Sequence, residues 1–296
     1  MLAAYATRFS PHDPLAALEV GDRPEPAARE NWTTVEVHAA SLNHHDLWSL
    51  RGVGLRAEQL PMILGTDAAG VTTDGREVVV HAVIGATGHG VGPAETRSLP
   101  SERYPGTLAE RVAAPTWNLV PKPAELTFAE ASCLPTAWLT AYRMLFTSGR
   151  ARPGDRVLVQ GASGGVSTAA LLLGVTTGLE VYVTSQDTAK RARALELGAA
   201  TWGHSVRSVR PGGTIVVAGA TAGDASPAEL QRIFFLELSV IGVTMGSKDD
   251  LVGLLNLLVR TGVRPIIDTQ LPLARAAAGL ARLEAGTQFG KIVLTT

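Results

Sequence analysis

The sequence predicts an α/β protein in which a doubly wound parallel sheet follows a β-rich first third. Two short apolar runs, Val157–Val159 and Val181–Val183, read as buried strands, and each is followed by a helical stretch. A glycine-rich segment joins the first run to its helix. In the first third, Val35–Ala39 alternates apolar and polar residues as a half-buried strand does. Strands that alternate with helices at this spacing form a parallel sheet with helices on both faces.

The boundaries of several elements follow from capping signals. Thr127 and Glu130 have the spacing of a capping box, so we expect a helix to begin there and to be interrupted at Pro135, which lacks an N–H donor. Asp187 is the expected N-cap of the helix after the second run, and Gly198 ends that helix. The remaining expected elements are a helix at 205–210, strands at 214–218 and 238–244, a helix at 249–260, and a tail with a strand from 265, a helix at 273–284 and a strand at 291–295.

Composition excludes several functional classes. Of the 296 residues, 46% are hydrophobic and 18% are charged, enough to bury a sizeable core. The net charge is −1 without a basic block, which argues against nucleic-acid binding. A single cysteine, Cys133, rules out an intramolecular disulfide and a cysteine-rich zinc site. The N-terminus has no signal-peptide pattern, and no apolar run could span a membrane, so we expect a soluble cytoplasmic protein.

The glycine-rich segment Gly161–Ser167 has the form of a dinucleotide-binding turn. Gly161 allows a tight turn, Gly164 lets the backbone approach a pyrophosphate, and the helix that follows offers free N–H groups and a positive dipole end. Ser167, at the position of the third glycine, is small enough to keep helix and strand close. An ordinary tight turn would share the glycines, but the flanking strand and helix, and a second strand ending about 20 residues later, favour nucleotide binding.

The end of the second strand indicates which nucleotide binds. An NAD site usually carries an acidic residue there, whereas this chain has the neutral Thr184 and Ser185 followed by Lys190 and Arg191. Hydroxyl donors and a nearby cation suit the 2′-phosphate of NADPH. The alternative is that the two cations are the solvated face of a helix. We favour NADPH as the cofactor.

Motifs spread over nearly the whole chain carry a family resemblance. They are Ala40–Asp46, Leu64–Val71, Gly106–Glu110, Pro135–Tyr142, the glycine turn and Gln288–Val293. The chain resembles the medium-chain dehydrogenase/reductase superfamily, and within it the zinc-less, quinone-oxidoreductase-like branch. The resemblance implies a GroES-like β domain (residues 1–122 and 265–296), an inserted Rossmann domain (123–264), and a homodimer formed through Leu238–Thr244.

The same resemblance suggests the site residues. Asn43 would hydrogen-bond the substrate or the nicotinamide ribose, Thr136 would line the cleft near the nicotinamide, and Trp48 stands near an aromatic substrate-site position. Each has a structural alternative: Asn43 as a turn residue, Thr136 as a helix N-cap, and Trp48 as packing. The expected cofactor-binding residues are Gly161, Ser163, Gly164, Gly165, Val166, Thr184, Ser185, Lys190, Gly219, Thr244, Phe289 and Lys291.

No metal site is expected. Zinc-dependent relatives use a cysteine in the loop that here carries Asn43, and a histidine and glutamate where this chain has Thr66 and Asp67. His44 and His45 remain, but adjacent side chains rarely converge on one ion and no thiolate helps them. A hydrogen-bonded loop around Asp46 is the simpler interpretation.

Without zinc, a conjugated carbonyl is the easier hydride acceptor, because charge spreads over its π system. The predicted activity is hydride transfer from NADPH to a quinone, an enone or a related carbonyl. Two alternatives remain: a zinc-less alcohol dehydrogenase-like enzyme, and a non-catalytic NADPH-binding sensor or interaction protein. Relatives continue after the position of Gly198 with a third strand, a helix and a fourth strand. Here about one strand-helix-strand unit is absent, and we expect the sheet to be short of strands on both sides of the glycine turn.

Overall fold

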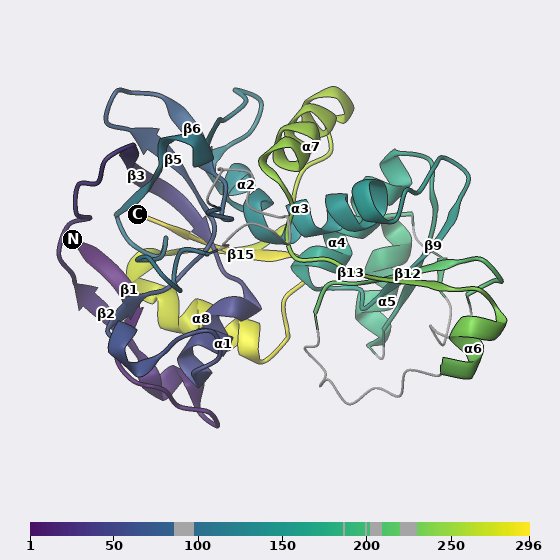
Figure 1. Ribbon diagram of the computed structural model, residues 1–296, viewed down its shortest axis with the longest axis horizontal. Coiled ribbons are helices and arrows are strands. Elements are labelled where there is room, and N and C mark those ends of the chain that lie inside the picture. Colours follow the sequence, from purple (N-terminus) through teal and green to yellow (C-terminus); the bar gives the residue numbers. More distant parts are fainter. Residues whose placement is uncertain (86–97, 186, 199, 202–208, 220–229) are drawn as a thin grey trace.

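The computed structural model describes residues 1–85, 98–185, 187–198, 200–201, 209–219 and 230–296. The chain forms two lobes (Figure 1): a β lobe, built from the first third and the tail, and a nucleotide lobe, built from the residues between them. Both ends of the chain lie in the β lobe. Within the described ranges, no helix has the length and apolar character needed to cross a bilayer.

The β lobe holds a seven-stranded sheet and a three-stranded sheet. The larger has the order β14-β15-β3-β5-β6-β8 with β7 also on β3, and the smaller has the order β2-β1-β4. The strands are β1 Leu2–Ala6, β2 Leu18–Asp22, β3 Trp32–Ser41, β4 Met62–Ile63, β5 Ala68–Thr72, β6 Glu77–Val80, β7 Arg111–Pro115, β8 Leu119–Pro121, β14 Ile267–Pro272 and β15 Lys291–Thr295. The helices are α1 His44–Arg51 and α8 Ala276–Glu284, and short 3₁₀ turns lie at Pro14–Ala17, Ala57–Gln59, Thr116–Asn118 and Leu273–Arg275.

The tail is part of the β lobe through its last strand. β15 runs antiparallel to β3, with Leu294 opposite Ala40, and β14 pairs in parallel with β15. This pairing carries Lys291, at the start of β15, to the end of β3. The return of the tail to the first lobe agrees with the expected β domain, although the exact domain boundaries remain a prediction.

A long helical segment connects the lobes. It comprises α2 Phe128–Ser132, π-helical turns at Leu134–Trp138 and Arg143–Ser148, and α3 Leu139–Tyr142. The predicted capping box is present, because Thr127 accepts a hydrogen bond from the Glu130 N–H while Glu130 accepts one from the Thr127 N–H. The expected interruption near Pro135 is present: α2 ends at Ser132, and Pro135 lies in the first turn of a separate π-helical segment, because it has no N–H to continue the α-helical hydrogen bonds.

The nucleotide lobe contains two separate parallel sheets. β9 Arg156–Gln160, β10 Glu180–Thr184 and the short β11 Ala200–Thr201 form one, in the order β11-β10-β9, and β12 Thr214–Val217 pairs with β13 Ser239–Gly242 in the other. The helices are α4 Gly165–Thr176, α5 Thr188–Glu196, α6 Leu230–Phe235 and α7 Lys248–Thr261. Asp187 caps α5 as expected, and Gly198 takes a positive φ of 96° after it. The helix expected at 205–210 falls mainly outside the described residues.

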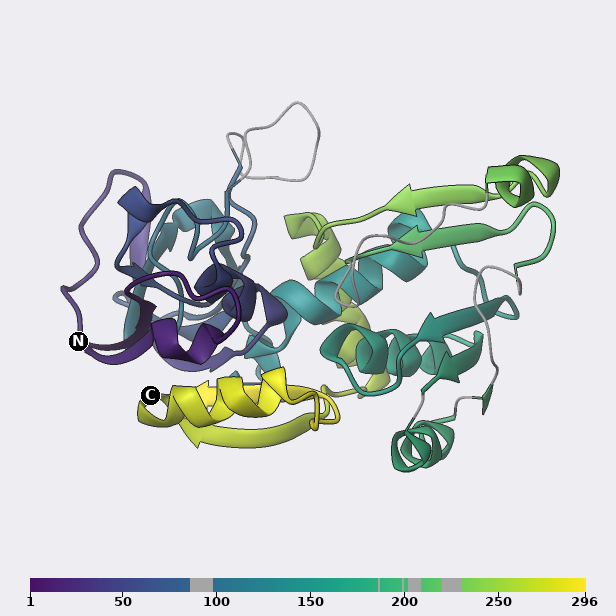
Figure 2. The same ribbon diagram turned by 90° about the horizontal axis from the view of Figure 1, so that it is seen from below.

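The described strands of the nucleotide lobe form two sheets that are not joined to each other. In the part of the chain that is described, β9 pairs with β10 alone and β12 with β13 alone, so no strand joins the two sheets. In Figure 2, β12 and β13 form a layer apart from β9 and β10. In the usual strand order, the fourth strand lies between the first and the fifth. The division between the two sheets falls at the place of that strand, directly beside β9, which leads into the glycine turn.

Candidate active site

The glycine turn has the geometry that a dinucleotide requires. Gly161 follows β9 with a φ of 82°, a left-handed conformation that favours glycine, and Gly164 is the N-cap of α4. Ser167 donates a hydrogen bond from Oγ to the Gly164 carbonyl over 3.0 Å and is almost buried, so it fits the place of the third glycine. The first N–H groups of α4 have no partner inside the helix. The turn therefore fits a pyrophosphate, which is the group that a dinucleotide would place there.

The carboxyl end of β10 presents polar groups beside this turn. The Thr184 hydroxyl accepts a hydrogen bond from the Gly161 N–H over 3.2 Å. Arg191 reaches back from α5 and donates to the Ser185 carbonyl over 2.7 Å. Lys190, the predicted cofactor-binding cation, instead donates to the Gly286 carbonyl over 2.5 Å. The cation that contacts Ser185 in the structure is thus Arg191.

The tail packs directly on the glycine turn. The Gly290 N–H donates to the Ser163 carbonyl over 2.8 Å. A Cβ added to Gly165 would lie 2.7 Å from Cδ of Lys291, so the lysine stem runs against the first residue of α4. Glycine at position 165 is therefore required by packing between the lobes, in addition to any role in holding a cofactor.

A buried polar network lies where the lobes meet. Lys291 Nζ donates to Asn43 Oδ1 over 2.6 Å and to the Leu42 carbonyl over 2.7 Å, and lies 3.6 Å from Asp67 Oδ2. Asn43 Nδ2 donates to the same Asp67 oxygen over 2.8 Å. Asp67 is fully buried and Lys291 is 3% exposed, so the charges of the pair are shielded from water.

Hydroxyl groups complete this network. Ser41 donates to Asp67 Oδ2 over 2.7 Å, and Thr136 donates to Asp67 Oδ1 over 2.5 Å. The hydroxyls of Thr136 and Thr66 lie 2.9 Å apart. Thr136 is half-buried while Asn43 is 8% exposed, so Thr136 is the more accessible of the two predicted residues. The structure brings Asn43, Thr136 and Lys291 together; whether each acts in catalysis stays a prediction.

The loop around α1 is fixed by a buried carboxylate. Asp46 accepts hydrogen bonds from the N–H groups of Asn43 and Gly65, as a hydrogen-bonded loop requires. Burial raises the pKa of Asp46 to about 6, although the charge of His45 and the hydrogen bond from Asn43 oppose that rise. Burial lowers the pKa of His45, but the Glu102 hydrogen bond and the nearby carboxylates outweigh it and raise that pKa overall. Burial and the Lys291 charge lower the pKa of His44.

The remaining predicted residues are more scattered. Trp48 is half-buried on α1 and Phe289 is half-buried beside the glycine turn. Gly219 and Thr244 are exposed, in the nucleotide lobe beyond β12 and β13. No signal in the sequence marked the ion pair of Asp67 with Lys291, because the two residues are far apart along the chain. The contact of Arg191 with Ser185 could have been found from helical geometry, since the first turn of a helix lies next to its N-cap.

The donor set does not fit a zinc ion. In the described part of the chain, no group of three or more His, Cys, Asp or Glu side chains could hold a metal. The Asp67 carboxylate is occupied by Ser41, Asn43 and Thr136, and the Lys291 ammonium already balances its charge. His45 is held between Glu102 and Ser101. We therefore assign no step to a metal.

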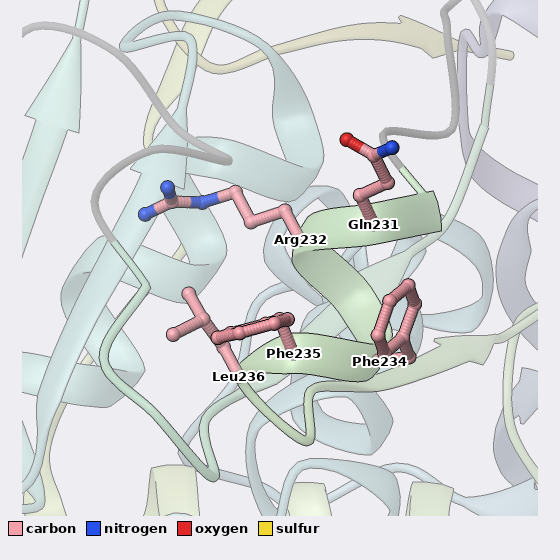
Figure 3. Close-up of a pocket in the computed structure, with 5 residues that line it drawn as sticks. All are labelled: Gln231, Arg232, Phe234, Phe235 and Leu236. Atoms are coloured by element: carbon pink, nitrogen blue, oxygen red, sulfur yellow. The ribbon is translucent and has the colours of Figure 1, made fainter.

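A surface hollow of the nucleotide lobe lies elsewhere. It is lined by Gln231, Arg232, Phe234, Phe235 and Leu236, all from α6 and the residue that follows it (Figure 3). The helix lies at the end of the nucleotide lobe far from the β lobe (Figure 1). The hollow does not include the glycine turn or the buried network, so it is not the predicted active site.

A nucleotide turn that contacts a buried polar network of a β lobe defines a two-domain dehydrogenase. The chain belongs to the medium-chain dehydrogenase/reductase superfamily, and it is an oxidoreductase of that superfamily. Residues 29–124 match the model of the alcohol dehydrogenase GroES-like domain, and residues 182–294 match that of the zinc-binding dehydrogenases. A crystal structure of an NAD-dependent alcohol dehydrogenase is 31% identical, with a TM-score of 0.90 and 100% of both chains covered.

Curated relatives differ in length. Quinone oxidoreductase of Mus musculus is 26% identical, with 91% of this chain and 90% of the mouse protein covered. That alignment runs over 313 positions, more than the 296 residues of this chain, so the mouse protein has residues without a counterpart here. Lovastatin diketide synthase mokB of Monascus pilosus is 32% identical over 55% of this chain, which spans only 6% of the synthase.

Proposed function

We propose that the chain is a zinc-independent reductase that transfers a hydride from NADPH to a conjugated carbonyl, such as a quinone or an enone. The observation that carries the proposal is the contact of Lys291 with both Gly165 of the nucleotide turn and Asn43 of the buried network. This contact puts the predicted cofactor turn and the predicted substrate residues at one junction. The donor set does not fit zinc, so the proposed substrate is one that accepts a hydride without a metal.

The bound nicotinamide would supply the hydride. The residues of this chain would orient the cofactor and the substrate. The free N–H groups of α4 would hold the pyrophosphate. The half-buried Thr136 hydroxyl, which donates a hydrogen bond to Asp67, lies at the junction of the two lobes. The charge that develops on a conjugated carbonyl spreads over its π system, so hydrogen-bond donors suffice to stabilise it. Solvent would deliver the proton.

NADPH is the proposed cofactor because Arg191 and Ser185 stand together at the end of β10. We expect Arg191→Gln to weaken NADPH binding about tenfold and to leave NADH binding unchanged, since only NADPH carries the 2′-phosphate. Fluorescence titration of both nucleotides measures this. Arg193→Gln is the matched control, because Arg193 lies on the same helix and pairs with Glu196. Equal weakening of both nucleotides would contradict the assignment.

The function itself is tested by nucleotide titration followed by an absorbance assay of NADPH oxidation with a panel of small quinones and enones. Turnover with at least one of these substrates supports the proposal. If neither nucleotide binds, the reductase assignment fails. Turnover limited to alcohols with NADP⁺ would instead support a zinc-less alcohol dehydrogenase.

A second candidate function is supported by the divided sheet of the nucleotide lobe. β9 and β12 have no common neighbour in the described residues, and the nicotinamide end of a dinucleotide normally lies beyond the fourth strand. Tight NADPH binding without turnover of any substrate would favour a non-catalytic sensor or interaction protein.

We further propose that the protein works in the cytoplasm as a homodimer, joined through residues 238–244. Among the described residues, β13 pairs with β12 on one edge only, and Val240 on this strand is 52% exposed. A strand edge of this kind offers unpaired backbone groups to a second copy. Sedimentation velocity of the purified chain distinguishes a dimer from a monomer.

A further inference from the structure

The environment of Lys291 Nζ is a cage of oxygen atoms. Its contacts are the Leu42 carbonyl and Asn43 Oδ1, at 2.7 and 2.6 Å, and the Asp67 carboxylate at 3.6 Å. The side chain is 3% exposed. An ammonium group carries three donors and no acceptor, so carbonyl, amide and carboxylate oxygens match it. The same oxygens would suit a hard cation, but they lack the nitrogen and sulfur ligands that zinc prefers.

The cage also fixes the Asn43 side chain at both ends. Its oxygen accepts from Lys291, and its nitrogen donates to Asp67 over 2.8 Å and to Thr66 over 3.2 Å. If the ammonium were absent, the amide could rotate, and the buried Asp67 charge would have no counter-ion. The orientation of Asn43 therefore depends on a residue 248 positions away in the sequence.

The lysine stem links this cage to the cofactor turn. Its Cδ lies 2.7 Å from the position that a Cβ at Gly165 would take, and Gly165 is the first residue of α4. The residue before Lys291 also bonds to this turn, since the Gly290 N–H donates to the Ser163 carbonyl. One side chain thus contacts the nucleotide turn along its stem and the substrate-side amide with its head.

We propose that the Lys291 ammonium is the permanent cation of this site, a positioning residue that orients Asn43 from an all-oxygen cage and leaves the cage closed to metal ions. A variant without the ammonium keeps the oxygens and acquires a vacant cation site. That site selects small hydrogen-bonding cations, and n-propylammonium replaces the lost part of the side chain best.

The test is chemical rescue of Lys291→Ala. We expect the variant to unfold at a lower temperature than the wild type. We expect n-propylammonium to raise that temperature again, because a ligand that binds only the folded state stabilises it. Methylammonium should have a smaller effect. Tetramethylammonium, which has no N–H group, should have none, and the wild type should respond to none of the three. If no ammonium ion stabilises the variant, the cage is not a cation site and the proposal is overturned.

The turnover arm of the test rests on the proposed function, whereas the thermal arm does not, so their failures are distinguishable. We expect kcat of Lys291→Ala to fall about 100-fold, as when the catalytic geometry is displaced, and to recover in n-propylammonium. Lys122→Ala is the matched control. Lys122 is also buried, donates to the carbonyls of Pro123 and Leu126, and pairs with Glu77. Its loss should lower the unfolding temperature but leave kcat unchanged.

If Lys291→Ala does not fold, the charge-neutral pair Lys291→Met with Asp67→Asn replaces it. This double variant should fold, because no buried charge is left unpaired. Its kcat should be about 100-fold lower than that of the wild type. Adding n-propylammonium should change neither its kcat nor its unfolding temperature. Wild-type turnover in the double variant would overturn the positioning role.

Discussion

The β lobe and the nucleotide lobe differ in how completely their strands are covered. In the β lobe, β3, β5 and β6 lie inside a seven-stranded sheet, and Val37, Ala69 and Val79 on them are almost fully buried. In the nucleotide lobe, β12 pairs with β13 in a separate sheet, and Val217 and Val240 are about half exposed.

Parallel strands normally lie buried on both faces, so β12 and β13 are an exception. The exposed apolar surface continues onto α6, where Phe234 and Phe235 are 66% and 81% exposed. The contrast follows the strand pairing: among the described residues β12 and β13 pair only with each other, whereas β3, β5 and β6 have neighbours on both sides. The half of the nucleotide lobe that keeps its neighbours, from β9 to α5, retains the glycine turn.

The largest expected difference between the two lobes is in the hydrogen exchange of their backbone amides. We expect the amides of β3 and β5 to be protected at least about a thousandfold more than those of β12 and β13, because local opening is easiest where few apolar contacts must break. Exchange followed by mass spectrometry at peptide resolution measures this. Similar protection in both lobes would show that the divided sheet opens only with the whole molecule.

Asp46 makes the stability of the β lobe depend on pH. Its pKa is about 6 in the folded state against 3.8 as the ordinary value, so the folded protein holds the proton more tightly than the unfolded chain. The resulting stabilisation is full below pH 3.8 and is lost as the pH rises to about 6, by about 3 kcal/mol. Urea unfolding at a series of pH values should show this loss, and Asp46→Asn should remove it. If the free energy of unfolding of that variant fell with pH as steeply as in the wild type, the loss would come from other groups.

Alanine variants of two glycines in the nucleotide lobe distinguish an effect on cofactor binding from an effect of backbone strain. Gly161 and Gly154 have similar positive φ values, 82° and 88°, and neither has a close neighbour that an added Cβ would strike. Alanine at either position should cost about 1 kcal/mol of stability. Only Gly161→Ala should also weaken NADPH binding, by about tenfold or more, because its backbone approaches the pyrophosphate. Equal nucleotide affinity in the two variants would exclude the turn as the binding site.

Features decided by neighbours in the sequence could be predicted well. The capping box at Thr127, the N-cap Asp187 and the turn at Gly161 follow from local hydrogen bonding and backbone conformation, and all are present. The shortage of strands beside β9 could also be predicted, because a strand-helix-strand unit needs a minimum length of chain. The break in the helix near Pro135 follows in the same way, because proline has no N–H to continue the hydrogen bonds of α2.

The sequence by itself determined the alternation of strands and helices, the glycine turn and the shortage of strands beside β9, because each depends on residues close together in the chain. Only the tertiary structure decided which side chains share the site. Antiparallel pairing of β15 with β3 brings Lys291 to Asn43 and Asp67. The physical reason is that contacts between distant residues are set by strand pairing and burial, and no local pattern records them.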